Sequence, residues 1–322
     1  MRPILKLYRG YANEQELIVM GHVFKPTKRE DYDFLSKNFK NASSVISMFR
    51  IKTMPNADVY LTHNNTQIHT KTLIDGYFKF CIPLDNTALF GWIDYEVSII
   101  HDNKTITSKE SFIRPYKGNL GIISDIDDTF LVSYTINPIK KLYHLLFRNV
   151  NSRKVFEDVV PHYQALSAAG RQNNEELNAF FYVSSSEWNL YRFLVEFTTI
   201  HKLPKAVLLL KDIKTSLTNF FWSGRGGHNH KFEKIKHILE FYPNLKYVLI
   251  GDDSQHDPFL YEAISKIFPL TVKVIYIRQT GKYKKKKVIK ALTNLESLNV
   301  SVCYFKTSTE AIEHSKKIGL IH

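Results

Sequence analysis

Three carboxylates follow a short apolar run in segment 121–129, whose sequence is GIISDIDDT. The apolar half is typical of a buried strand, and Asp125, Asp127 and Asp128 come where that strand would end. If the extended geometry continues, Asp125 and Asp127 point to the same side. Carboxylates this close repel each other unless a cation lies between them, and Mg²⁺ beside a phosphate is commonly held this way. Taken alone, the segment is equally compatible with an acidic turn.

Polar residues also follow two later apolar runs. The run at 180–184 ends in Ser184, and the run at 247–251 is followed by Asp252. Lys231 stands where the helix before that second run should begin. Each feature alone has an ordinary explanation as a helix cap, a turn or a solvated lysine. Because parallel strands end at the same edge of a sheet, their combination predicts one site.

Phosphoryl transfer through an aspartyl-phosphate is the chemistry that needs this set of groups. Asp125 would be the nucleophile, and Asp127 would protonate the leaving oxygen and later deprotonate the hydrolytic water. Asp252 would complete a Mg²⁺ site with Asp125 and the backbone carbonyl of Asp127. Lys231 would balance the negative charge, and the Ser184 hydroxyl would hold a phosphate oxygen.

The neighbours of these residues receive more modest roles. Ser184 is preferred to Ser185 because it comes first after the apolar run, and Ser186 is expected to cap a helix. Either Asp253 or Asp257 would support the metal ligands from behind. Asp128 is assigned to the turn.

The elements that would position these groups lie in residues 117–322. Apolar runs at 120–124, 180–184, 206–210, 247–251, 272–277 and 301–305 alternate with helical segments at 137–148, 155–169, 187–200, 229–241, 258–267, 285–297 and 308–318. This alternation predicts an α/β domain with a parallel sheet covered on both faces.

Residues 1–116 have a different pattern, with short runs suited to strands separated by turn residues. The runs are 16–24, 57–62, 67–72, 77–82, 93–100 and 105–112, whereas 31–51 is ambiguous and partly helical in character. This spacing predicts a β-sandwich domain of immunoglobulin-like or transthyretin-like type. The boundary is expected at 115–118, whose sequence is PYKG.

Composition limits the class of protein and its partners. The formal net charge of +13 favours an anionic partner, such as a phosphorylated substrate, anionic lipid or nucleic acid. No apolar run approaches the roughly 18 residues of a membrane span, and the first residues lack a signal-peptide core. Only Cys81 and Cys303 are present, which argues against a disulfide framework and favours the cytoplasm.

The motifs resemble those of a known superfamily. DIDDT at 125–129, YVS at 182–184, HK at 230–231 and LIGDDSQHDP at 249–258 are similar to the four motifs of haloacid dehalogenase-like phosphatases. More narrowly, the chain resembles the actin-patch-protein type of phosphatidate phosphatase, a lipin-related family. The narrower resemblance includes RGY at 9–11, DGYF at 75–78, Trp188 and YIR at 276–278.

This resemblance implies a Rossmannoid parallel sheet, Mg²⁺ as cofactor and phosphatidate as substrate. It assigns Asp125, Asp127, Ser184, Lys231 and Asp252 the roles given above. It also implies a small helical cap formed by residues 130–170. The chain departs from the family pattern where Asp253 replaces an expected serine and Glu187 replaces a common proline.

Several further features bear on partners. The segment 219–227, which contains Phe220, Phe221 and Trp222, could contact a membrane or pack inside the protein. Histidines 228, 230 and 237 invite a zinc hypothesis, which is disfavoured because no cysteine or acidic partner stands at ligand spacing. The basic run 284–287 is expected to be a solvated helix start.

Other functions remain open at this point. One is a nucleic-acid end phosphatase, although no groove combining aromatic and basic residues is evident. Others are a non-catalytic phospho-acceptor and a lipid-binding module whose β domain does the binding. The leading hypothesis is a Mg²⁺-dependent phosphatidate phosphatase that contacts membranes peripherally.

Overall fold

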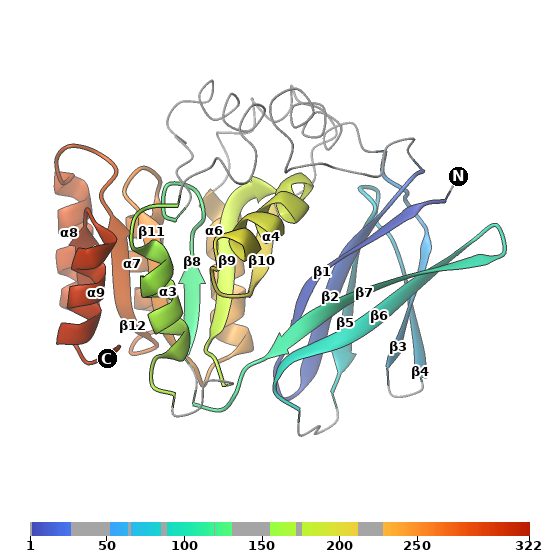
Figure 1. The fold of residues 1–322 in the computed structure, drawn as a ribbon, viewed down its shortest axis with the longest axis horizontal. Helices are drawn as coiled ribbons and strands as arrows, with labels where there is room; N and C mark the ends of the chain where they lie inside the picture. The colour runs from blue at the N-terminus through green and yellow to red at the C-terminus, as the bar shows by residue number, and fades with distance from the viewer. Residues whose placement is uncertain are drawn as a thin grey trace.

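A computed structural model of the chain shows two sheets packed side by side (Figure 1). It describes residues 2–26, 52–63, 66–84, 89–118, 120–130, 155–171, 176–211 and 228–322. The ambiguous segment 31–51, the helix predicted at 137–148 and the aromatic residues 220–222 therefore lie outside the described residues. No described helix is both long and apolar enough to cross a membrane.

The second sheet has six parallel strands in the order β10-β9-β8-β11-β12-β13. Their bounds are β8 Leu120–Ser124, β9 Ala179–Glu187, β10 Ala206–Lys211, β11 Lys246–Asp252, β12 Val272–Arg278 and β13 Ser301–Phe305. All six predicted apolar runs therefore form strands, and the α/β prediction is confirmed. The strand order reverses between neighbours β8 and β11, where sheets of this kind bind ligands.

Helices cover both faces of this sheet (Figure 1). The helices are α3 Val159–Ala168, α4 Tyr191–Ile200, α6 His228–Phe241, α7 Asp257–Ile267, α8 Lys286–Glu296 and α9 Ser308–Lys317, with a short 3₁₀ turn at Trp188–Leu190. Local signals explain several starts: α7 has proline in its first turn, and Thr307 and Glu310 form a capping box before α9.

The predicted cap needs a correction where the structure describes it. Residues 130–170 were expected to lie over the site, but α3 is one of the helices that cover the sheet. Its Val159, Tyr163 and Leu166 are buried in the main hydrophobic core, and His162 Nε2 lies 2.9 Å from Ser315 Oγ of α9. Residues 131–154 lie outside the described ranges.

The first sheet contains seven strands in the order β4-β3-β6-β7-β1-β2-β5. They are β1 Ile4–Ala12, β2 Glu16–Phe24, β3 Asp58–His63, β4 Thr66–Lys71, β5 Tyr77–Pro83, β6 Gly91–His101 and β7 Lys104–Arg114. The β structure was predicted correctly, except that β1 was missed. The strands form two antiparallel groups joined through a short parallel pairing of Gly10 with Phe112 and Tyr11 with Ile113. Residues of both groups share one buried core, and the sandwich type stays a prediction.

A continuous hydrophobic core joins the two sheets. The ring of Tyr8 stacks on Trp188 with centroids 4.1 Å apart, and Tyr11 and Met20 belong to the same buried cluster as the parallel sheet. Arg9 donates through its Nη1 to the Ala206 carbonyl of edge strand β10, at 3.1 Å. The predicted boundary at 115–118 lies between β7 and β8, and the division into two domains remains a proposal.

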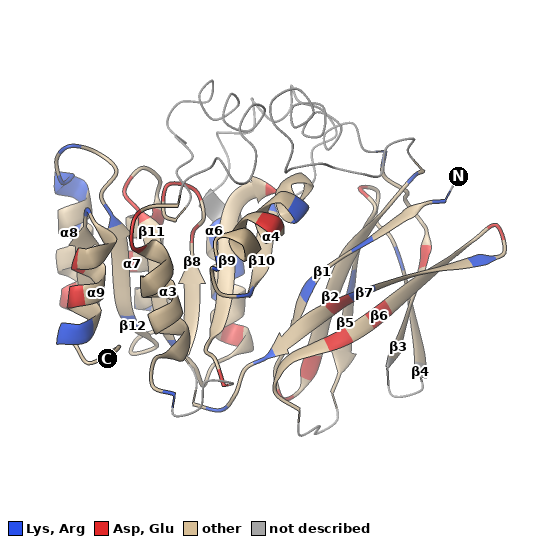
Figure 2. Ribbon diagram, in the orientation of Figure 1, with Lys and Arg blue, Asp and Glu red and all other residues tan. Residues whose placement is uncertain are grey.

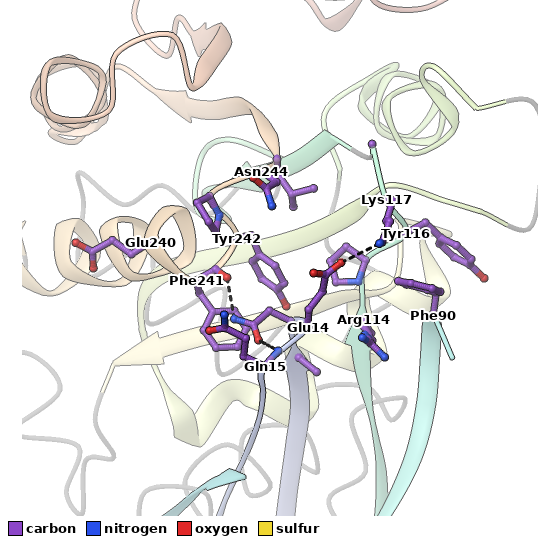
Figure 3. A pocket seen from close by; sticks show the side chains of 16 residues that line it. Glu14, Gln15, Phe90, Arg114, Tyr116, Lys117, Glu240, Phe241, Tyr242 and Asn244 are labelled. Carbon is purple, nitrogen blue, oxygen red and sulfur yellow. Dashed lines mark hydrogen bonds and ion pairs between the residues drawn. The ribbon is translucent and has the colours of Figure 1, made fainter. Parts of the chain in front are cut away.

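A cleft of about 480 Å³ opens at this junction, beside the chain that enters β8 and β11 (Figure 3). Asn13 Nδ2 donates to the Phe241 carbonyl at 3.0 Å, and Lys117 pairs with Glu14 at 3.3 Å. Both members of that ion pair are largely exposed. The cleft lies toward the amino ends of the parallel strands, away from the carboxylates at their carboxyl ends.

Candidate active site

The candidate site lies where three neighbouring parallel strands end. Strand β8 runs between β9 and β11, and the Asp125 N–H donates to the Ile250 carbonyl at 2.9 Å. Acidic residues occupy the loops that follow β8 and β11 at this end of the sheet (Figure 2). The sequence prediction that these strand ends share one edge is confirmed.

Lys231 lies between two buried carboxylates. Its Nζ is 3.0 Å from Asp125 Oδ1 and 2.6 Å from Asp257 Oδ1, and all three side chains are almost fully buried. Burial alone would lower the pKa of Lys231, but Asp125 and Asp257 outweigh that effect and raise it above the ordinary value. Lys231 is therefore held as a buried ammonium that reaches the site from the first turn of α6.

The pKa values of Asp125 and Asp252 are both raised by this arrangement. Burial raises the pKa of Asp125 well above its ordinary value, whereas the Lys231 ammonium opposes that shift. Burial and the nearby Asp257 together raise the pKa of Asp252 to about 6. Both shifts show that the ionised carboxylates are held in surroundings that do not fully compensate their charge.

The carboxylates of Asp125, Asp252 and Asp257 form a group that fits a metal ion. One oxygen from each lies within 4.8 Å of the others, and all three residues are buried. Three carboxylates against one ammonium leave two uncompensated negative charges in the cluster when all are ionised. Asp125 Oδ1 is buried and accepts no hydrogen bond, although it contacts Lys231 as an ion pair. Oxygen ligands with excess negative charge suit a hard divalent cation.

Gly251 makes room for Asp257 at the end of β11. A Cβ at position 251 would lie 2.5 Å from Asp257 Oδ2 and 2.7 Å from its Cβ. The Asp257 carboxylate therefore packs directly against the strand, where its Oδ2 accepts from the Asp252 N–H at 3.4 Å. The sequence suggested Asp257 or Asp253 as a residue that supports the metal ligands. In the structure Asp257 belongs to the acidic trio itself and also pairs with Lys231.

Asp127 faces the strand that ends in serines. Ser186 Oγ donates to Asp127 Oδ2 at 3.0 Å, and the Ser186 N–H donates to Ser184 Oγ at 3.0 Å. The prediction that Ser186 caps a helix is wrong, because Glu187 precedes the first helical turn and makes no side-chain capping bond. Ser184 is fully buried and connects to Asp127 through Ser186.

Asp253 and Asp128, the remaining acids of the two motifs, have roles in the local structure. Asp253 accepts hydrogen bonds from Thr280 Oγ1 at 2.5 Å and Tyr304 at 2.6 Å, so it ties down the segment after β12. The sequence left undecided whether Asp253 supports the metal ligands. In the structure its carboxylate is bonded to Thr280 and Tyr304. Asp128 has a φ of 57°, the left-handed conformation that an aspartate tolerates in a turn.

Sequence reasoning missed two polar contacts to the nucleophile candidate. Gln255 Nε2 donates to Asp125 Oδ2 at 3.2 Å and lies 3.5 Å from Asp252 Oδ2, so it connects the two carboxylates. Thr129 Oγ1 lies 3.5 Å from Asp125 Oδ2. The signal was present, because Gln255 follows Asp252 by three residues in the same loop and Thr129 closes the first motif.

His237, the last of the three histidines in α6, contacts the first sheet. His237 Nε2 lies 3.0 Å from Tyr11 of the first sheet, and burial lowers the pKa of His237. The acidic trio is the cluster with metal-ligand spacing in the part of the chain that the structure describes. Lys285, in the basic run, contacts Asp253, and α8 begins at the next residue.

Comparison with known proteins gives the context for this geometry. Residues 120–279 match the model of the family described as "Phosphatidate phosphatase APP1, catalytic domain". The chain is 26% identical to phosphatidate phosphatase APP1 of Saccharomyces cerevisiae over 246 residues, which cover 76% of this chain and 39% of that protein. It is 24% identical to an uncharacterized protein of Schizosaccharomyces pombe, over 68% of this chain and 37% of the other. The chain therefore spans well under half the length of these relatives.

Solved structures resemble the chain only weakly. A carbohydrate acetylesterase from Xanthomonas citri has a TM-score of 0.35 and 11% identity, over 99% of this chain and 74% of that one. A β-glucuronidase from Parabacteroides merdae has a TM-score of 0.31 and 10% identity, over 93% of this chain and 39% of that one. Values this low carry no argument about fold or activity.

Proposed function

Because residues 120–279 belong to the family of phosphatidate phosphatase APP1 catalytic domains, we propose that this chain is a Mg²⁺-dependent phosphomonoesterase of the haloacid dehalogenase-like class. The proposed substrate is phosphatidate, and the products are diacylglycerol and inorganic phosphate. One observation carries the proposal: Lys231 bridges Asp125 and Asp257 inside a buried acidic cluster at the end of β8 and β11.

In the proposed first step, a carboxylate oxygen of Asp125 attacks phosphorus. The bond between phosphorus and the leaving alcohol oxygen breaks, and Asp127 donates a proton to that oxygen. The hydrogen bond from Ser186 holds the Asp127 carboxylate on the β9 side of the site. The products of this step are the alcohol and a phosphorylated Asp125.

In the proposed second step, a water molecule attacks phosphorus of the aspartyl-phosphate. Asp127 accepts a proton from the water, the bond between phosphorus and Asp125 breaks, and inorganic phosphate leaves. Asp125 and Asp127 then have the protonation states with which they began. The Lys231 ammonium offsets negative charge on the phosphoryl group throughout, and the Ser184 hydroxyl is proposed to orient a phosphate oxygen.

Asp125, Asp252 and the backbone carbonyl of Asp127 are the proposed ligands of Mg²⁺, and the position of Asp257 makes it a candidate fourth. When bound, Mg²⁺ would supply positive charge to the phosphate oxygens and favour the ionised form of Asp125. The excess negative charge of the buried trio supports this assignment.

The decisive experiment measures phosphate released from phosphatidate in mixed micelles, with Mg²⁺ and with a chelator. We expect activity only with Mg²⁺, and we expect Asp125→Asn to remove it. Asp128→Asn is the matched control, because it changes an acid of the same motif that occupies the turn. Full activity of Asp125→Asn would exclude this mechanism.

The same assay separates the competing functions. Parallel reactions with phosphorylated oligonucleotides test a nucleic-acid end phosphatase. A single turnover with stable phosphorylation of Asp125 would instead indicate a phospho-acceptor module. Sustained release from phosphatidate together with inactivity on oligonucleotides is the result we expect.

A further inference from the structure

The turn between β4 and β5 presents two aliphatic side chains to solvent. Leu73 is 61% exposed and Ile74 is 90% exposed. Large apolar residues scattered singly over a surface are ordinary, but two in succession at the tip of a turn are less so. We call Leu73 and Ile74, with the neighbouring Lys25 and Lys52, the apical tip.

The apical tip is built rigidly. The Leu73 N–H donates to the Tyr77 carbonyl at 2.7 Å, and the Gly76 N–H donates to the Leu73 carbonyl at 2.9 Å. Thr53 Oγ1 donates to the Ile74 carbonyl at 3.3 Å. Gly76 has a φ of 77°, which favours glycine and fixes the turn. The exposure of the two aliphatic side chains is therefore set by an ordered backbone.

Two lysines flank the aliphatic pair. The Lys25 N–H donates to the Lys52 carbonyl at 2.8 Å, and both side chains are exposed. Lys52 precedes Thr53, whose hydroxyl donates to the Ile74 carbonyl, so the backbone that carries the two lysines runs beside the aliphatic pair. The one acid of the turn is Asp75, whose Oδ1 accepts from the Tyr77 N–H at 3.0 Å. Aliphatic side chains beside lysines match the two layers of an anionic membrane surface, with hydrocarbon below and negative headgroups above. The net charge of +13 acts in the same direction.

The position of the tip adds a functional argument. The turn between β4 and β5 lies at the same end of the molecule as the loops that follow β8 and β11 (Figures 1 and 2). The continuous core between the two sheets fixes their relation, because Tyr8 and Tyr11 are buried against the parallel sheet.

We propose that the apical tip docks on an anionic lipid bilayer and thereby holds the catalytic edge at the membrane surface. This inference deepens the proposed function, because it states how an active site reaches a substrate that stays in a bilayer. Leu73 and Ile74 would enter the headgroup region, while Lys25 and Lys52 would contact lipid phosphates.

The test compares two pairs of exposed aliphatic residues. The first variant is Leu73→Ser with Ile74→Ser. The matched control is Ile267→Ser with Leu270→Asn, which removes residues that are 51% and 71% exposed near the start of β12, toward the other end of the sheet. Asparagine suits position 270 because Leu270 has a φ of 64°.

Binding is measured by sedimentation with vesicles of phosphatidylcholine, with and without phosphatidylserine. These vesicles contain no substrate, so the result is independent of catalysis. We expect wild-type protein and the control to bind the anionic vesicles, and the tip variant to bind them about tenfold more weakly. Lys25→Glu with Lys52→Glu should also weaken binding, and this loss should shrink at high salt.

A second readout is phosphate release from two forms of phosphatidate. The tip variant should lose activity on vesicles yet keep wild-type activity on a short-chain, monomeric phosphatidate. If wild-type protein hydrolyses neither form, the proposed function fails while the binding result still stands. Vesicle binding by the tip variant equal to wild type, an equal loss in the control, or no wild-type binding to vesicles would overturn the docking proposal.

Discussion

The catalytic edge and the junction between the two sheets both bury polar groups, but they treat charge in opposite ways. At the catalytic edge, the buried Lys231 ammonium contacts the buried carboxyl groups of Asp125 and Asp257 at 3.0 and 2.6 Å. At the junction, the buried Tyr8 hydroxyl and His22 Nδ1 form a neutral hydrogen bond of 2.9 Å.

This difference separates groups that stabilise the fold from groups that are available for chemistry. Neutral hydrogen-bonded groups can be buried at little net cost, whereas buried ions are retained only with partners and at the expense of stability. The presence of a cleft does not identify the groups that are available for chemistry. The cleft of Figure 3 is lined by an exposed ion pair, whereas the buried ion pairs lie at the catalytic edge.

Replacing Lys231 should have the largest effect on both stability and activity. Lys231→Met leaves the carboxylates of Asp125 and Asp257 buried without their cation, which should cost about 3–5 kcal/mol of unfolding free energy and abolish turnover. Chemical denaturation and phosphate release measure the two effects. Lys285→Met is the matched control, because Lys285 pairs with an acid of the same loop but is 44% exposed. A stability loss as small as that of the control would mean that the catalytic edge does not depend on buried charge.

Gly251→Ala tests how closely the catalytic edge is packed. The new Cβ would overlap the Asp257 carboxylate, displace it and move Lys231 with it, so we expect activity to fall about 10- to 100-fold. Gly121→Ala is the matched control near the amino end of the neighbouring strand β8, where a Cβ would meet the Tyr247 ring. The control should lower stability while each folded molecule keeps its activity; equal activity losses in the two variants would contradict this.

The buried His22 at the junction should make the stability of the protein depend on pH. Burial, and secondarily Lys6, lowers the pKa of His22 from 6.5 to about 3. Between these values the unfolded chain binds a proton that the folded chain does not, so stability falls as pH falls through this range. His162 acts in the same direction, whereas the raised pKa of Asp252 opposes it.

Comparing wild-type protein with His22→Gln isolates the His22 contribution. Within the range below pH 6.5, the slope of unfolding free energy against pH should differ by about 1.4 kcal/mol per pH unit. Above about pH 7 the two slopes should coincide, because histidine is then neutral in both states. Urea unfolding over this pH range measures the slopes. Identical slopes at low pH would show that His22 is charged in the folded protein.

The smallest effect is expected at the cleft of Figure 3. Glu14→Gln removes the ion pair with Lys117, whose side chains are 60% and 79% exposed respectively. Exposed ion pairs contribute little to folding stability. The free energy of unfolding should therefore change by less than about 0.5 kcal/mol, and activity should not change. Thermal unfolding and phosphate release check this. A large change in activity would give this cleft a role that its charges do not indicate.

The sequence predicted the parallel sheet well because its strands are buried on both faces. Runs such as 120–124 and 247–251 are continuously apolar, and the strand ends carry the acids that meet in the structure. The structure places β8 next to β11 and thereby Asp125 beside Asp252. Periodicity was therefore sufficient to predict which strand ends share one edge of the sheet, but not their order.

Contacts that depend on tertiary packing were harder to predict from the sequence. Ser186 resembles a helix cap in sequence, yet its hydroxyl bonds Asp127 because β9 extends to Glu187. Asp257 resembles a helix-start acid, and only its packing against Gly251 brings it to Lys231. Strand β1 was missed although Ile4–Ala12 alternates in part, because its buried face contacts residues far away in the sequence.

That arrangement of β1 has a consequence for synthesis of the chain. The Arg9 N–H donates to the Tyr191 hydroxyl at a sequence separation of 182 residues, and Arg9 Nη1 donates to the Ala206 carbonyl at a separation of 197. The ribosome therefore synthesises β1 and its neighbour β2 long before Tyr191 and Ala206, which β1 contacts in the parallel sheet. Contacts between residues so distant in sequence are expected to slow folding.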